Sequence, residues 1–168
     1  MAISRGSTRI SQIAMVVHDL DESMKVLYET LAWGPWTVYE LAPPLLHSTR
    51  LHGRPVEFSM LAAECEVPPG VTVELVQPLL GPSIYKEWLD QHGEGVQHIA
   101  CRMKTQGEAD DFRKEWAGRG IDVLMAGRIG QTIEFEYLDT QPMLKFILET
   151  GSGESTEVVP IRTYPPTM

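Results

Sequence analysis

The chain repeats its own pattern once, at an offset of 86 residues. A single offset relates an apolar run, a helix-like run and the glycine that ends it, which is stronger evidence than any one matched pair, although two copies still allow coincidence. We interpret the pattern as an ancient duplication of one structural module. The matched positions are Gln12-Ile13-Ala14 with His98-Ile99-Ala100, Glu22 with Glu108, Glu29 with Glu115, and Gly34 with Gly120.

Each copy is predicted to form a strand, a helix and three further strands. Apolar runs with β-branched residues predict the strands, and acids at 19–22 followed by apolar residues at helical spacing predict the first helix. The predicted strands are 10–17, 36–41, 56–62 and 71–76 in the first copy and 96–103, 121–126, 132–137 and 144–149 in the second, with helices at 19–31 and 108–117. The connection 42–55 holds three prolines and a glycine and is predicted to be a loop over a site.

These elements divide the chain into five segments. We expect an N-terminal extension (1–9), a first βαβββ module (10–80), a linker with a short helix (81–95), a second βαβββ module (96–150) and an irregular, exposed C-terminal tail (151–168) that is rich in Ser, Thr and Pro.

Charge and cysteine content exclude several classes of partner. The formal net charge of −9 disfavours nucleic acid and anionic membranes as the main partner, because both would repel the protein. No stretch approaches the roughly 18 apolar residues that a membrane-spanning helix needs. Cys65 and Cys101 have no CxxC spacing, so buried free thiols in a reducing cytosol are expected rather than a zinc knuckle or a disulfide framework. We therefore expect a cytoplasmic protein.

Four polar residues interrupt strand faces that are otherwise small or apolar. Because side chains alternate along a strand, Gln12 shares a face with Ala14 and Val16, and Glu74 shares one with Thr72 and Val76. Burying a carboxylate without a partner costs several kcal/mol, so acids in such strands need a reason. The four residues are Gln12, Glu74, His98 and Glu149.

The same four residues respect the duplication. Gln12 and His98 occupy the first strand of each copy, and Glu74 and Glu149 occupy the last. A pseudo-two-fold pairing of the copies would bring them to one central cavity. An amide oxygen, an imidazole and two carboxylates form a hard donor set suited to Mn, Co, Ni, Mg, Fe(II) or Zn, and would leave two octahedral positions for substrate or water.

The opening QIAMVVHDLDESMKVLYETLAWG resembles the vicinal oxygen chelate superfamily, which includes glyoxalases, bleomycin-resistance proteins and extradiol dioxygenases. Within that superfamily the segments VEFSMLAAE, VTVELVQPLLG, YKEWLDQHGEGVQHIACRM and LKFILET are most similar to the methylmalonyl-CoA epimerase family, and the resemblance covers roughly residues 10–150. It implies an α+β fold in which paired βαβββ modules form a U-shaped, partly closed mixed sheet around a metal site. It also implies a homodimer.

The resemblance places the metal ligands on Gln12, Glu74, His98 and Glu149 and a catalytic carboxylate on Glu57. Glu149 is a second candidate for proton transfer if it can leave the metal. The epimerases usually have His at the position of Gln12 and Gln at that of Glu74, and the set found in this chain instead resembles the ligands of glyoxalase I. The basic residues that would bind glutathione are not recognisable, and the two histidines of an extradiol dioxygenase site are not both present.

The function expected from these residues is that of a divalent-metal-dependent epimerase or isomerase. It would remove a proton next to the carbonyl of a small-molecule carbonyl or thioester substrate while the metal stabilises the enolate. The alternatives are a glyoxalase I-type lyase or isomerase, and a metal-free protein that binds or sequesters a small molecule. In the last case His98 is an ordinary core histidine, and Glu74 and Glu149 are solvated or paired with a buried arginine such as Arg102.

Overall fold

Eleven strands and four helices form the part of the chain that the computed structural model describes, residues 9–68, 70–153 and 158–166. The strands make one open, mixed sheet with the order β11-β2-β5-β6-β1-β7-β10-β9-β8-β3-β4. The predicted α+β class with a mixed, incompletely closed sheet is therefore confirmed. The elements are β1 (Gln12–Val16), α1 (Leu20–Leu31), β2 (Trp36–Leu41), β3 (Leu46–Leu51), β4 (Arg54–Pro55), β5 (Ser59–Val67), β6 (Val71–Leu80), α2 (Ile84–His92), β7 (Gly95–Arg102), α3 (Gln106–Ala117), β8 (Val123–Ile129), β9 (Ile133–Leu138), α4 (Gln141–Leu144), β10 (Ile147–Ser152) and β11 (Arg162–Tyr164).

The two halves of the sheet meet at β1 and β7 with a symmetric register. These strands are antiparallel, and Gln12 pairs with Ala100 while Ala14 pairs with His98. Within each half the first strand runs parallel to the last, so that Ala14 pairs with Glu74 and Ala100 pairs with Glu149. Positions 86 residues apart in β1 and β7 are thus equivalent in space, and so are Glu74 and Glu149.

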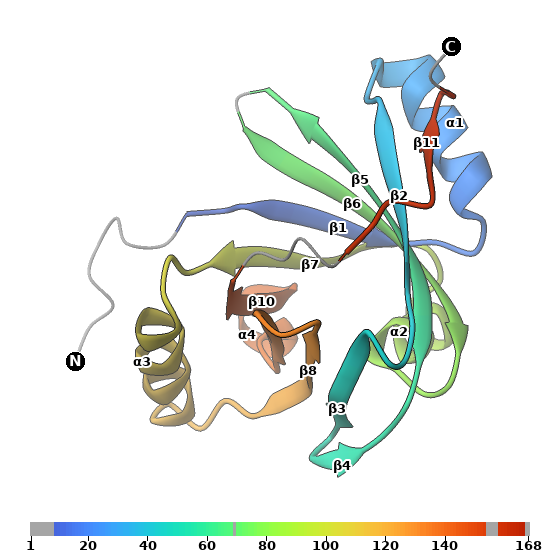
Figure 1. The fold of residues 1–168 in the computed structure, drawn as a ribbon. Helices are drawn as coiled ribbons and strands as arrows, with labels where there is room; N and C mark the ends of the chain where they lie inside the picture. The colour runs from blue at the N-terminus through green and yellow to red at the C-terminus, as the bar shows by residue number, and fades with distance from the viewer. Residues whose placement is uncertain (1–8, 69, 154–157, 167–168) are drawn as a thin grey trace.

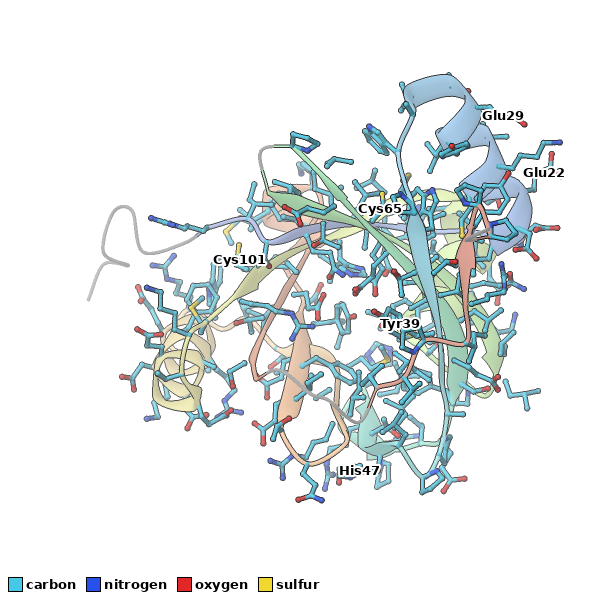
Figure 2. The ribbon with its side chains drawn as sticks, turned by 45° about the horizontal axis from the view of Figure 1, so that its top comes forward. Glu22, Glu29, Tyr39, His47, Cys65 and Cys101 are labelled. Carbon is cyan, nitrogen blue, oxygen red and sulfur yellow. The ribbon has the colours of Figure 1, made fainter. Side chains whose placement is uncertain are left out.

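Each half carries one long helix on the outer face of its strands. Asp19 caps α1 by accepting a hydrogen bond from the backbone N–H of Glu22, and Thr105 forms a capping box with Glu108 at the start of α3. The two helices lie at opposite ends of the molecule (Figure 1). Glu22 and Glu29, two of the repeated positions, are exposed and project outward from α1 (Figure 2).

The buried residues form three clusters. One lies between α1 and the first half and includes Met24 and Trp36, and a smaller one lies between α3 and the second half and includes Phe112 and Trp116. The third joins residues of both halves and of α2, such as Leu41 and Phe135. Because this central cluster draws on both halves, their inner faces are held together.

The structure corrects two predictions about irregular segments. The connection 42–55 is not a loop over the site, since it contains β3 and β4, and β3 pairs with β8 at the far edge of the second half. The tail 151–168 is not irregular throughout, since it begins inside β10 and contains β11, which pairs with β2 at the edge of the first half. Each half thus has its outer strand paired with a strand from a distant part of the chain, and the two open edges of the sheet are the short strands β4 and β11.

Smaller differences concern the ends of elements. The predicted strand 56–62 begins later, at Ser59, and continues to Val67. The predicted N-terminal extension, apart from Arg9, lies outside the described residues. No helix in the described part of the chain combines the length and the apolar character that membrane crossing requires. Cys65 and Cys101 are buried free thiols, as predicted.

Candidate functional site

A cavity of about 470 Å³ opens between the inner faces of the two halves. One part of its lining is polar and comes largely from the central strands, and the rest is apolar. Gln12, Glu74 and Glu149 are among the polar lining residues. His98 does not line the cavity. It is fully buried and contacts the two lining carboxylates, Glu74 and Glu149.

The structure brings the four predicted site residues together. They lie on β1, β6, β7 and β10, the four adjacent central strands, and their relative exposures are 6% for Gln12, 8% for Glu74, 0% for His98 and 3% for Glu149. The parallel and antiparallel registers place the two carboxylates on either side of the β1–β7 pair. The alternation of side chains along apolar strands was therefore a sufficient signal to find this cluster.

The ring of His98 is held by a hydrogen-bond relay. Gln97 Nε2 donates to the carbonyl oxygen of Ile84 at 2.9 Å, which leaves Gln97 Oε1 to accept from His98 Nδ1 at 3.0 Å. A carbonyl can only accept, so this relay fixes the proton on Nδ1. His98 Nε2 is then turned toward the carboxylates, 3.2 Å from Glu149 Oε2 and 3.4 Å from Glu74 Oε2.

Two buried atoms in this cluster have no aligned hydrogen bond to another described residue. His98 Nε2 and Glu149 Oε2 face each other without satisfactory hydrogen-bond geometry, and buried polar atoms normally find a partner. As the side chains stand, no group of three or more His, Cys, Asp or Glu within the described ranges is arranged to hold a metal ion. The residues fit a divalent ion through their donor types and through these two buried atoms, not through their present spacing.

The electrostatics of the cluster place a positive charge on the imidazole. Burial alone would lower the pKa of His98, but the adjacent carboxylates of Glu149 and Glu74 outweigh it and raise the pKa to about 9. Burial would raise the pKa of Glu149, whereas the contact with His98 and the charge of Arg102 lower it. A protonated His98 between two carboxylates thus takes the place of a cation, and a metal ion binding there would have to displace that proton.

Glu64, which the sequence analysis did not select, belongs to the same site. It lies on β5 directly opposite Glu74 in the register and lines the cavity. Its Oε1 accepts a hydrogen bond from Gln12 Nε2 at 3.3 Å. Burial, together with the charges of Glu74 and Glu149, raises the pKa of Glu64 to about 7 against the opposing charge of Arg102. The alternation Met60, Ala62, Glu64 on one strand face is the signal that could have identified it.

Glu57 is not brought to this site. It is exposed and lies between β4 and β5, outside the strand in which it was expected. It borders a separate surface depression with Pro43, Pro44 and Val56, and it is not among the residues that line the main cavity. Its location gives the predicted role as catalytic base no support.

Two tyrosines complete the polar part of the lining. Tyr85 and Tyr137 join their hydroxyl groups by a hydrogen bond of 2.7 Å, and the ring of Tyr137 packs edge-on against His98 with centroids 5.0 Å apart. Burial and the nearby carboxylates raise the pKa of both tyrosines well above 10. Both therefore stay neutral phenols at physiological pH.

Comparisons with known proteins agree with this architecture. The sequence model described as Glyoxalase/Bleomycin resistance protein/Dioxygenase superfamily matches residues 11–136. A search among curated proteins found no match. Among solved structures, a hypothetical protein from Bacillus halodurans C-125 has a TM-score of 0.64 at 17% identity, over 89% of this chain and 97% of that chain.

Two further similar structures are epimerases. Methylmalonyl-CoA epimerase from Mycobacterium tuberculosis has a TM-score of 0.59 at 17% identity, over 94% of this chain and 95% of that chain. A variant of Streptomyces coelicolor methylmalonyl-CoA epimerase in complex with 2-nitronate-propionyl-CoA has a TM-score of 0.52 at 22% identity, over 89% of this chain and all of that chain. At these identities the similarity establishes the fold.

Proposed function

Because the chain belongs to the glyoxalase/bleomycin resistance protein/dioxygenase superfamily, we propose that it is a divalent-metal-dependent epimerase or isomerase. It removes a proton next to the carbonyl of a small-molecule carbonyl or thioester substrate. The observation that carries this proposal is the convergence of Gln12, Glu74, His98 and Glu149 beside one cavity, with Glu64 next to them.

The ion would be held by Gln12, Glu74, His98 and Glu149. The amide nitrogen of Gln12 is engaged with Glu64, which leaves its carbonyl oxygen as a donor, and the relay through Gln97 leaves His98 Nε2 as another. These donors suit Mn, Co, Ni, Mg, Fe(II) or Zn. When bound, such an ion supplies Lewis-acid polarisation of the substrate carbonyl and stabilises negative charge on its oxygen.

Glu64 is the proposed base that accepts the substrate proton. It lines the cavity without being one of the proposed ligands, and Gln12 Nε2 orients its carboxylate through one oxygen. Glu149 comes from the opposite half and, once released from the metal, would act on the other face of the substrate, as epimerisation requires. The apolar residues of the lining limit access of water to the reacting carbon.

The test is exchange of solvent deuterium into methylmalonyl-CoA, chosen as the first probe because similar folds carry that activity. In D2O the wild type should exchange the proton at carbon 2 for deuterium, and mass spectrometry measures the deuterium incorporated. Glu64→Gln should slow exchange by about 10²- to 10⁴-fold, the range for loss of a general base. Glu57→Gln, the matched control, should behave as wild type. If Glu57→Gln instead slows exchange and Glu64→Gln does not, Glu57 is the catalytic base and Glu64 is not.

A wider panel decides the proposal itself. If the wild type exchanges neither acyl-CoA thioesters nor hydroxy or keto acids, proton abstraction next to a carbonyl is not its chemistry. The hemithioacetal of methylglyoxal with glutathione tests a glyoxalase I-type isomerase or lyase, because that activity requires a thiol adduct.

A metal-free binding or resistance protein is the second candidate. It is favoured by the present side-chain arrangement, in which His98 lies within contact of two carboxylates and no group of three or more metal-type side chains among the described residues could hold an ion as it stands. Elemental analysis of the purified protein, with thermal unfolding in a series of divalent ions, separates the candidates. Absence of both bound metal and metal-dependent stabilisation would select the binding protein.

The predicted homodimer and cytoplasmic location remain part of the proposal. Size-exclusion chromatography with light scattering tests the first, and fractionation of cells that make the protein tests the second. A monomer at all concentrations would remove the homodimer.

A further inference from the structure

Arg102 is the only Lys or Arg among the described residues that line the cavity. It is the last residue of β7, and alternation along that strand places it on the same face as Ala100 and His98. Its side chain is about one-third exposed (35%), so its charge can be reached from the cavity. This position puts a cation next to the proposed reaction site without making it a ligand.

Among the described residues, the guanidinium group of Arg102 has one ion-pair partner, and that contact is loose. Oε1 of Glu149 lies 3.7 Å from one terminal nitrogen. Among the described residues no hydrogen bond is donated by its side chain, although a guanidinium carries five N–H donors in a planar fork. By contrast, Arg113 donates to Glu136 at 2.8 Å and also contacts Asp110. An arginine that served only to pair with a carboxylate would be expected in such close contact.

Most of the remaining residues that line the cavity are apolar. Leu41, Met60, Ile129 and Phe135 belong to the central buried cluster, and Ile133 and Val158 pack against it. A ligand that fits this cavity therefore combines an oxyanion for Arg102 with a short hydrocarbon part for the wall. The planar fork of arginine matches the two oxygens of a carboxylate.

We propose that Arg102 binds a free carboxylate of the substrate and thereby selects carboxylate-bearing carbonyl compounds. The inference rests on the proposed function, because it takes this cavity as the substrate site. Arg102 is a specificity-determining residue here, and it differs from Glu64 and the four proposed ligands in touching a part of the substrate that does not react.

The competing role for Arg102 is balance of charge. Glu64, Glu74 and Glu149 surround the cavity, and one cation beside them offsets part of their repulsion. In that role any positive side chain serves equally well, so Arg102→Lys keeps the wild-type preference between a charged and a neutral ligand. The two roles are therefore distinguished by the ratio of the affinities for a charged and a neutral ligand, and not by the stability of the variant proteins.

The experiment measures dissociation constants of methylmalonate and of its neutral diamide by isothermal titration calorimetry with the full-length, metal-loaded protein. The wild type should prefer methylmalonate. Arg102→Gln should reduce that preference by about tenfold or more, because a charge-assisted bidentate pair is lost. Arg102→Lys should give an intermediate preference, since an ammonium keeps the charge and loses the fork. Elemental analysis must show equal metal content in all variants.

Arg113→Gln is the matched control, because Arg113 lies on α3 outside the cavity and should leave the preference unchanged. An undiminished preference in Arg102→Gln, or a wild-type preference in Arg102→Lys, would overturn the proposal. Should Arg102→Gln not fold, Arg102→Lys alone decides. The binding measurement requires no turnover. If the wild type exchanges no deuterium, the proposed function is wrong, but the measured preference for methylmalonate still decides whether Arg102 binds the carboxylate.

Discussion

The two halves of the sheet share a register and differ in what they place at the equivalent positions. Opposite the glutamate of the last strand, the first half has Glu64 facing Glu74, whereas the second has Tyr137 facing Glu149. In the first strand, Gln12 stands where the second half has His98. The scaffold thus supplies paired positions, and the differences between the halves make the site asymmetric, which a chiral or stepwise reaction needs.

The two halves also differ in the size of the side chains at equivalent positions. In the first half Tyr39 pairs with the small Ala62, and in the second the small Gly127 pairs with the large Phe135. Large and small residues are therefore exchanged across the equivalent strand pair. The exchange places the ring of Tyr39 from the first half and the ring of Phe135 from the second in the cavity lining, and the first half also contributes the additional acid, Glu64.

The largest expected effect is the loss of metal affinity when either of the equivalent residues Glu74 and Glu149 is replaced. If both halves give one carboxylate to the same ion, Glu74→Gln and Glu149→Gln should each weaken binding of Co²⁺ or Mn²⁺ by about 100-fold or more, since even residues one step removed from a metal cost 10- to 100-fold. Titration calorimetry measures this. Glu57→Gln, the control, lies outside the cavity and should stay within a few-fold of wild type. A loss confined to one of the two glutamates would show that the halves do not contribute equally.

The exchange of bulk predicts a smaller effect on stability. A Cβ atom on Gly127 would lie 2.6 Å from Phe135 Cζ and 2.9 Å from Thr49 Cγ2, so Gly127→Ala forces a buried ring to move. We expect it to lower the free energy of unfolding by about 1–3 kcal/mol, as overpacking does, measured by urea denaturation.

Phe135→Leu provides the double-mutant test of that contact. Alone it should cost stability, but combined with Gly127→Ala it should cost less than the sum, because the shorter side chain makes room for the new methyl group. Strict additivity would show that the new methyl group is not relieved by shortening Phe135, which leaves Thr49 as the clash, and would weaken the comparison with Tyr39 and Ala62.

The sequence was sufficient where a local pattern decides the outcome. The 86-residue offset and the alternation along apolar strands located Gln12, Glu74, His98 and Glu149, because neighbouring strands and faces follow from period and order. It failed for β3 and β11, whose pairing partners β8 and β2 lie far along the chain. Prolines near β3 favoured a loop, and no local property of that segment indicates the distant edge that it covers.

Glu57 and Glu64 show the same limit at the site. The resemblance placed the catalytic carboxylate on Glu57, inside the predicted strand 56–62, but β5 starts two residues later, at Ser59, and Glu57 stays outside the strand. Where a strand begins depends on its partner, here β6, and not on its own residues alone. A strand end placed at Ala62 also left Glu64 outside the predicted element. Both errors arise because the predicted strand 56–62 starts and ends too early compared with β5.

The two buried thiols allow the smallest expected difference between the halves to be measured. Cys65 belongs to the cluster under α1 and Cys101 to the cluster under α3. Burial raises the pKa of Cys65 to about 11, and burial with the charge of Glu149 raises that of Cys101. At pH 8 only about one Cys65 in a thousand is then a thiolate, and the thiolate is the form that reacts with Ellman's reagent. Both thiols should therefore react slowly in the native protein, and the order in which they react reports which half opens first.

We expect Cys101 to react first, by a factor of a few. Its cluster contains five buried residues among those described, against nine in the cluster of Cys65, and local opening costs less where fewer apolar contacts must be broken. The variants Cys65→Ala and Cys101→Ala isolate each thiol, and the rate of each should rise steeply in urea. If the native thiolate reacts, each rate rises about tenfold per pH unit up to the raised pKa. Reaction after local opening instead levels off near the pKa of an exposed thiol, about 8.5, so rates at pH 9 and 10 separate acidity from opening. Faster reaction of Cys65 at both pH values would contradict the expected order. It would mean that the first half, despite its larger buried cluster, opens more easily than the second.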